Sequence, residues 1–298
     1  MLYGKQGAWV TRLTERGYTY CLWEPTVPRV SDIYAKCVIY LYPSISLAQK
    51  GERYGGSGFL FGLPVPGYDK RFIHFAVTNS HVVRKPANTV IRINTADDEL
   101  DYITIPNKHW LHHDWCDIAI SPLVVEHDKY ENVLVGPGDL LTEKIAASHD
   151  IGLGDDCFIV GRFINHEGKQ KNRPSLRFGN IAQMPGDPLV LDDGSAQEGF
   201  LVEARSISGY SGSPVFVEIR PFAHGARPMN SSGRGGPWLL GIDFCHVPVT
   251  EKIYSRKTMK ESKTNFVKGN SGMMGVIPAW RLLEMMDYAD VKSLIERQ

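Results

Sequence analysis

The sequence of 298 residues lacks the features that mark several common classes of protein. Its formal net charge is zero, because 33 Lys and Arg residues balance 33 Asp and Glu residues, so the chain as a whole does not favour nucleic acid or an anionic membrane. No run of apolar residues approaches the ~18 needed to span a bilayer, and the N-terminus lacks the apolar core of a signal peptide. We therefore expect a cytoplasmic protein that binds neither nucleic acid nor membrane.

Cysteine is also scarce, with five residues in the whole chain. An odd number without any C-x-x-C spacing argues against both a disulfide framework and a structural zinc module. The expected state is reduced, buried thiols, and we expect neither a metal nor another cofactor.

Alternation of apolar and polar residues, bounded by turn residues, predicts about six strands in each half of the chain. Helices do not alternate with these strands, which excludes a parallel sheet because parallel neighbours need helical crossovers. The pattern predicts an all-β fold of two antiparallel β-barrels with a C-terminal α-helix. The predicted strands are 36–42, 58–63, 71–78, 89–94, 101–105, 117–123, 157–163, 175–182, 199–205, 214–220, 238–244 and 273–277.

These strands divide the chain into five parts. Two polar segments rich in Gly, Ser and Lys, 223–237 and 251–272, are predicted to be long surface loops of the second barrel. The expected parts are an N-terminal arm 1–35, a first barrel 36–134, a linker 135–156, a second barrel 157–277 and a helix 278–298.

The segment 208–216 carries the strongest signal for chemistry. Glycines flank Ser211 in a tight turn that leads into an apolar strand, so the turn can present the hydroxyl outward. The N–H groups of Gly209 and Ser211 would then converge on one point and stabilise a developing oxyanion. This is the arrangement that acyl transfer requires.

Two residues of the first half complete a candidate triad. His81 stands just after an apolar strand, and Asp117 begins another, where a carboxylate can accept the Nδ1 proton of an imidazole. The order is His, Asp, Ser, with the histidine and the acid in the first series of strands and the serine in the second.

These motifs resemble those of the trypsin-like (chymotrypsin-fold) serine peptidases, and among them the bacterial V8-like and Deg-type branches. The matching stretches are 78–83, 117–119 and 209–214, and the resemblance extends over roughly 36–297. It implies a serine endopeptidase that cleaves polypeptides through an acyl-enzyme, with His81 as general base and acid, Asp117 as its orienting group, Ser211 as nucleophile, and the Gly209 and Ser211 amides as oxyanion hole.

The chain departs from this family in how it would be activated. Tyr210 precedes the nucleophile, so the acid that pairs with a newly cut N-terminus in trypsin-type zymogens is absent. The site is then either constitutively competent or gated by a regulatory protein partner or the ordering of a loop, and we expect gating.

The resemblance also assigns a pocket for the substrate residue before the scissile bond, lined by Arg205, Ser206, Ser208, Asp243 and Gly275. Asp243 would select a basic side chain, whereas Arg205 with Ser206 would select an acidic one. An ion pair between Arg205 and Asp243 would cancel both preferences. A basic side chain is weakly favoured, and a register error of one residue would reverse the assignment.

Two other hypotheses compete with this one. The segment 109–117 is dense in His, Asp and Cys side chains that can bind zinc, but it lacks the helical i, i+4 spacing of a zinc motif. A protease-like binding module would keep the fold and work by recognition alone, as part of an intracellular complex. The intact triad positions argue against that module.

Overall fold

The computed structural model describes residues 9–13, 19–23, 30–52, 55–68, 71–84, 87–125, 129–130, 133–191, 194–218, 236–254, 256 and 261–296. Contacts divide the chain into two units, residues 1–34 and 35–298. In the first unit, β1 (Trp9–Leu13) pairs in antiparallel register with β2 (Thr19–Trp23), a hairpin that the sequence pattern did not predict.

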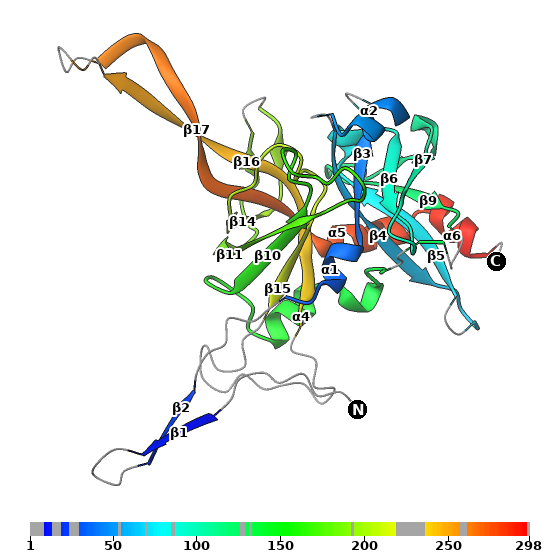
Figure 1. Cartoon of the computed structure of the whole chain (residues 1–298), viewed down its shortest axis with the longest axis horizontal. Helices are drawn as coiled ribbons and strands as arrows, with labels where there is room; N and C mark the ends of the chain where they lie inside the picture. The colour runs from blue at the N-terminus through cyan, green and yellow to red at the C-terminus, as the bar shows by residue number, and fades with distance from the viewer. Residues whose placement is uncertain are drawn as a thin grey trace. The chain divides into compact units, whose positions relative to one another are not determined.

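The second unit contains two large sheets of antiparallel strands, as the sequence predicts for the chymotrypsin type of all-β fold (Figure 1). The first sheet has seven strands in the order β7-β6-β3-β4-β5-β9-β8 and forms a half-barrel. The second is a closed six-stranded barrel in the order β10-β11-β14-β17-β16-β15. The strands of the first sheet are β3 (Val38–Tyr42), β4 (Gly56–Pro64), β5 (Phe72–Thr78), β6 (Val90–Asn94), β7 (Leu100–Thr104), β8 (Leu111–His112) and β9 (Ala119–Leu123).

Each sheet encloses its own hydrophobic core. Ile39, Leu60 and Ile91 are fully buried in the first core, and Phe200 and Leu240 are fully buried in the second. The barrel strands are β10 (Asp156–Gly161), β11 (Ser175–Gln183), β14 (Phe200–Glu203), β15 (Pro214–Glu218), β16 (Trp238–Tyr254) and β17 (Glu261–Pro278), beside a small pair of strands, β12 (Leu189–Val190) and β13 (Ala196–Gln197).

Helices are short and lie between or after the strands. Ser44 caps α2 and Thr142 caps α4, because each hydroxyl accepts the backbone N–H of the residue three positions later. The C-terminal helix is two helices, α5 and α6, interrupted around Asp287. The helices are α1 (Ile33–Lys36), α2 (Ile45–Lys50), α3 (Ser80–Arg84), α4 (Glu143–Ser148), α5 (Ala279–Met286) and α6 (Ala289–Glu296), with 3-10 turns η1 (Asn107–His109) and η2 (Pro137–Asp139). No helix in the described ranges is long and apolar enough to cross a membrane.

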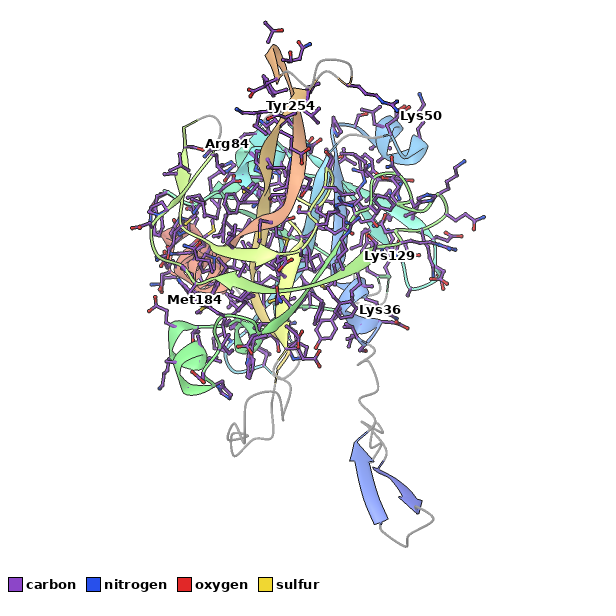
Figure 2. The ribbon with its side chains drawn as sticks, turned by 90° about the vertical axis from the view of Figure 1, so that its left-hand side faces the viewer. Lys36, Lys50, Arg84, Lys129, Met184 and Tyr254 are labelled. Carbon is purple, nitrogen blue, oxygen red and sulfur yellow. The ribbon has the colours of Figure 1, made fainter. Side chains whose placement is uncertain are left out.

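The predicted surface loop 251–272 is wrong, because β16 and β17 continue through most of it as a paired ribbon. The pairing runs from Pro248 opposite Asn270 to Tyr254 opposite Glu261, and the ribbon extends beyond the barrel, with Tyr254 near its far end (Figures 1 and 2). Charged and polar residues are mixed with exposed apolar ones such as Phe266, so its composition resembles that of a loop. Most of the other predicted loop, 223–237, lies outside the described residues.

A buried ionic cluster joins the two sheets. Glu167, in the segment after β10, accepts hydrogen bonds from Arg162 at the end of the same strand and from Arg92 of β6, and both guanidinium groups are fully buried. The Tyr42 hydroxyl also donates to Glu167 at 2.8 Å, and its ring faces Arg162 with 4.2 Å between the guanidinium carbon and the ring centre. The cluster fixes the segment after β10 against the first sheet.

Four cysteines in the second unit are reduced thiols outside any disulfide, and three of them are buried. Burial raises the pKa of Cys116 to about 11, and those of Cys37 and Cys245 to about 12. These thiols are therefore protonated at neutral pH and poorly suited to nucleophilic chemistry.

Candidate active site

His81 lies in the first turn of α3, directly after strand β5 ends. The residues before it are tied to the start of β9, since the Asn79 side-chain amide donates to the Asp117 carbonyl at 2.9 Å and the Ser80 hydroxyl to the Ile118 carbonyl at 2.8 Å. These bonds bring His81 next to Asp117, which lies 36 positions later in the chain.

The carboxylate of Asp117 binds His81 at two points. Its Oδ1 accepts the backbone N–H of His81 at 2.8 Å, and its Oδ2 lies 2.5 Å from the Nδ1 atom of the ring. Because a carboxylate only accepts hydrogen bonds, this contact places the ring proton on Nδ1 and leaves Nε2 as the basic nitrogen. The Asp117 backbone N–H in turn donates to the Gln197 side chain at 2.9 Å.

The electrostatic surroundings favour the charged form of His81. Burial lowers its pKa, but the hydrogen bond and the charge of Asp117, together with the charge of Asp243, outweigh burial and raise the pKa above its ordinary value of 6.5. An imidazole with a raised pKa is a stronger base, and its protonated form is better stabilised.

Ser211 lies in the tight turn that precedes β15. Gly209 and Gly212 have φ values of 99° and 89°, a region that favours glycine. A Cβ atom at Gly212 would lie 2.0 Å from the Ser57 carbonyl oxygen, and one at Gly209 would lie 3.0 Å from the Arg162 carbonyl oxygen. Both glycines are therefore required by conformation and by close packing.

Ser57 of β4 holds this turn from the first sheet. Its N–H donates to the Ser211 carbonyl at 2.8 Å, and its hydroxyl donates to the Gly209 carbonyl at 2.7 Å. The same hydroxyl accepts the Arg162 N–H at 2.9 Å. One side chain thus links the nucleophile turn to the strand end that carries the buried ionic cluster.

The amides of Gly209 and Ser211 have no hydrogen-bond acceptor among the described residues, whereas the neighbouring amides of Tyr210 and Gly212 donate to carbonyl groups. Two unpaired N–H groups on either side of a turn match the donors of an oxyanion hole. Both amides are therefore available to an acceptor, and their role as an oxyanion hole stays a prediction.

The structure packs the nucleophile turn against the helix that carries His81. A Cβ atom added to Gly56 would lie 2.8 Å from the Ser211 carbonyl oxygen and 3.0 Å from a methyl group of Val82, the residue after His81. Thr78, three residues before His81, likewise lies against Gly212. The three candidate triad residues thus come from the segment just before β9, from α3 and from the turn before β15.

The structure differs from the predicted substrate pocket in the exposure of its residues. Asp243 is completely buried, and its Oδ2 accepts the Ser206 hydroxyl at 2.7 Å, so it offers no surface to a substrate side chain in this structure. Arg205 and Ser208 are exposed, and no ion pair joins Arg205 to Asp243 in the part of the chain described here. Gly275 lies beneath the Phe244 ring, which a Cβ atom at Gly275 would approach to 2.6 Å.

Two of the three histidines of segment 109–117 bind protein groups through their rings. The Nδ1 atom of His112 lies 2.9 Å from the Ser80 hydroxyl, and the Nε2 atom of the buried His113 lies 3.1 Å from a carboxylate oxygen of Glu284 in α5. No group of three His, Cys, Asp or Glu residues in the described ranges is arranged to hold a metal ion.

The sequence analysis missed Ser57 and Gln197 as supporting residues. Each acts from a distant position, 152 residues from Gly209 for Ser57 and 80 residues from Asp117 for Gln197. Neither belongs to a local motif, so only the folded topology reveals them.

No protein-family model and no curated protein sequence matches this chain. Solved structures similar to it are HtrA- and Deg-type trypsin-like serine proteases. The HtrA-type protease AlgW, with a tripeptide, is 17% identical with a TM-score of 0.46, and the similarity covers 90% of this chain and 64% of the AlgW chain. Deg5 is 18% identical with a TM-score of 0.44, covering 84% of this chain and 87% of Deg5. The MamO protease domain from Magnetospirillum magneticum is 15% identical with a TM-score of 0.43, covering 86% and 98%.

Proposed function

We propose that this protein is a serine endopeptidase that cleaves polypeptides with the triad His81, Asp117 and Ser211. The observation that carries the proposal is the pairing of a bidentate Asp117–His81 contact, at 2.5 and 2.8 Å, with two unpaired amides around Ser211. A turn with only a structural role has no need of two unpaired N–H groups around one serine.

In the proposed reaction, the Ser211 Oγ attacks the scissile carbonyl carbon while Nε2 of His81 takes the hydroxyl proton. Asp117 keeps the proton on Nδ1 and stabilises the imidazolium. The N–H groups of Gly209 and Ser211 donate to the oxyanion of the tetrahedral intermediate. The intermediate collapses as the carbon–nitrogen bond breaks and His81 returns the proton to the leaving amine.

The second half of the reaction uses the same groups. Water loses a proton to His81 and attacks the acyl-enzyme ester, and the second tetrahedral intermediate collapses with the proton returned to Ser211 Oγ. The carboxyl product leaves, and no cofactor is consumed.

The test is labelling of the purified protein by a fluorophosphonate probe, which forms a covalent bond with an activated serine. The wild type should label, Ser211→Ala and His81→Ala should not, and Asp117→Asn should label on the order of 10⁴-fold more slowly because the imidazole tautomer is no longer held. Ser148→Ala, which alters an exposed serine of α4, is the matched control and should label like the wild type. Labelling that survives in Ser211→Ala would contradict the proposed nucleophile.

Gating by a partner is part of the proposal, and one observation supports it. No hydrogen bond joins the Ser211 hydroxyl to His81 among the described residues, so the nucleophile and base must approach before proton transfer begins. If the wild type labels only after a cell extract or peptide is added, the site is gated. If it stays unlabelled under all these conditions, the second candidate function, a protease-like binding module, replaces the first.

A further inference from the structure

A groove of about 380 Å³ lies between α4, the segment after β11 and the start of α5, and the proposed reaction does not use it. Its apolar lining includes Ile151, Met184 and Trp280, of which Met184 is labelled in Figure 2. The Trp280 ring packs edge-on against the buried Phe200, with 5.6 Å between the ring centres, so its orientation is fixed. An indole and a thioether offer a large apolar contact area, and the groove can therefore take up an apolar side chain.

The groove is also acidic. Glu143, Asp150 and Glu198 line it, and its lining residues in the described part of the chain include no Lys or Arg. Arg281 binds the Glu198 carboxylate at 2.9 and 2.5 Å, whereas the exposed Glu143 and Asp150 have no ion-pair partner among the described residues. The dipole of α4 does not favour Asp150, which lies just beyond the helix C-terminus, where the dipole is negative. Two uncompensated carboxylates at an apolar groove complement a ligand that is both basic and apolar.

The spacing of these two carboxylates fits an extended peptide. Glu143 and Asp150 are seven positions apart along α4 and the turn that ends it, which corresponds to about 10 Å at ~1.5 Å per residue. In an extended peptide, residues i and i+2 lie roughly 6.6 Å apart, and their side chains point away from the side that residue i+1 faces. If residue i+1 lies on the floor of the groove, its two neighbours point outward. Long Lys or Arg side chains can then reach both carboxylates.

The same groove adjoins the orienting acid of the candidate triad. The Glu198 carbonyl accepts the Gln197 side-chain N–H at 3.2 Å, and the Gln197 side-chain oxygen accepts the Asp117 N–H at 2.9 Å. Arg281, which binds Glu198, also lies over the Trp115 ring, with 4.3 Å between the guanidinium carbon and the ring centre. A ligand that contacts Glu198 is therefore two hydrogen bonds away from Asp117.

We propose that this groove docks an extended polypeptide segment of a regulatory partner, in which one apolar residue stands between two basic ones. The carboxylates of Glu143 and Asp150 bind the two basic side chains, and the apolar side chain lies against Trp280 and Met184. The partner that gates the site is thereby given both a chemistry and a place on the fold.

Docking acts on the triad through Glu198. A segment that contacts Glu198 restricts Gln197, and Gln197 holds the backbone of Asp117. Docking itself does not depend on catalysis, whereas this effect on Asp117 rests on the proposed peptidase function and deepens it.

Binding is tested with a dansyl-labelled peptide amide, Lys-Leu-Lys-Leu-Lys, titrated into the full chain and followed by fluorescence anisotropy. All proteins carry Ser211→Ala, so that the peptide stays intact. Adding Glu143→Gln and Asp150→Asn should weaken binding roughly five- to thirtyfold, as the loss of two exposed ion pairs predicts. Asp97→Asn with Glu99→Gln, which removes two exposed acids between β6 and β7, is the matched control and should bind like the parent protein.

Two further comparisons test the apolar part of the groove. Ala147→Tyr places a ring in the groove from α4 without changing any charge and should abolish binding, whereas Lys144→Tyr, on the same helix but outside the lining, should weaken it far less. A peptide with Ser in place of Leu should bind on the order of tenfold more weakly. A parent protein that does not bind the leucine peptide would overturn the proposal. Equal binding of the two peptides, or binding that survives both the double neutralisation and Ala147→Tyr, would also overturn it.

The rate of fluorophosphonate labelling separates docking from its effect on the triad. Saturating peptide should raise the labelling rate of the wild type roughly fivefold or more, the lower end of ordinary coupling between sites. Gln197→Ala should bind the peptide as tightly as the wild type and show no such rise. A peptide that binds the groove and leaves the rate unchanged would refute the effect on Asp117 alone. A protein that binds the peptide as expected and never labels would refute the peptidase function and leave docking in place.

Discussion

Replacing Glu167 by glutamine tests whether the buried ionic cluster holds the two sheets together. The two guanidinium groups that share its carboxylate, those of Arg92 and Arg162, have no exposed surface. Glutamine keeps the size of the side chain and removes its charge, so both guanidinium groups lose the negative charge of Glu167 while remaining out of water. Other groups still contact them, including the carbonyls of Ala48 and Glu52, but neutral acceptors do not replace a negative charge.

The magnitude follows from this geometry. Breaking a buried ion pair by removing one partner costs about 3–5 kcal/mol. For a chain of this size each kcal/mol lowers Tm by about 2–4 °C, so Glu167→Gln should melt roughly 6–20 °C below the wild type. Tyr42→Phe, which removes only the 2.8 Å hydrogen bond to Glu167, should cost about 1.5 kcal/mol.

Urea unfolding at pH 7, followed by intrinsic fluorescence, gives the free energies to compare. Asp98→Asn is the control, because it breaks an exposed ion pair with Lys171 of the segment after β10, and it should leave the unfolding midpoint unchanged. A loss of less than about 1 kcal/mol in Glu167→Gln would refute the argument, since it would mean that the tyrosine rings and carbonyls suffice to neutralise both arginines.

Three further predictions concern the site. Gly209→Ala should slow fluorophosphonate labelling on the order of 10²-fold. Alanine is strained at a φ of 99°, and its methyl group would press on the Arg162 carbonyl and displace the N–H that we propose as an oxyanion donor. Normal labelling would exclude Gly209 as a donor. Because the pKa of His81 is raised, the labelling rate should decline with falling pH at a midpoint above 6.5. The folding stability that comes from charged His81 should be complete below pH 6.5 and should be lost as the pH rises through the pKa of the folded protein. A midpoint of the labelling rate below 6.5 would contradict this. Gln197→Ala should slow labelling several-fold with little change in Tm, since it leaves the half-exposed Asp117 amide to water; equal rates would show that Gln197 does not orient the acid.

Much of the strand pattern was predictable because alternation reports burial on one face of a sheet. The predicted strands 58–63 and 71–78 fall within one or two residues of β4 and β5. The ribbon of β16 and β17 was missed because its two faces are both exposed, so polar side chains occupy positions that a barrel strand would fill with apolar ones. The short helices α2 and α4 were missed because six residues are too few to show a helical period.

The candidate triad could be selected from local motifs, and its catalytic role stays a prediction. The orientation of Asp243 was not predictable, because the pairing of β16 with β17 shifts register between Asp243 and Cys245. Such a bulge changes which side of the sheet each following side chain faces, and no local pattern in the sequence predicts it.

Because of Ser57, neither barrel alone contains all the hydrogen bonds of the nucleophile turn. The nucleophile turn belongs to the second barrel by sequence, yet Ser57 of β4 makes two of the hydrogen bonds that shape it. Either barrel expressed alone would therefore present an incomplete turn, and Ser211 would acquire its geometry only after the two halves have docked. In a nascent chain, the turn around Ser211 would therefore reach its native shape only in the last step of assembly.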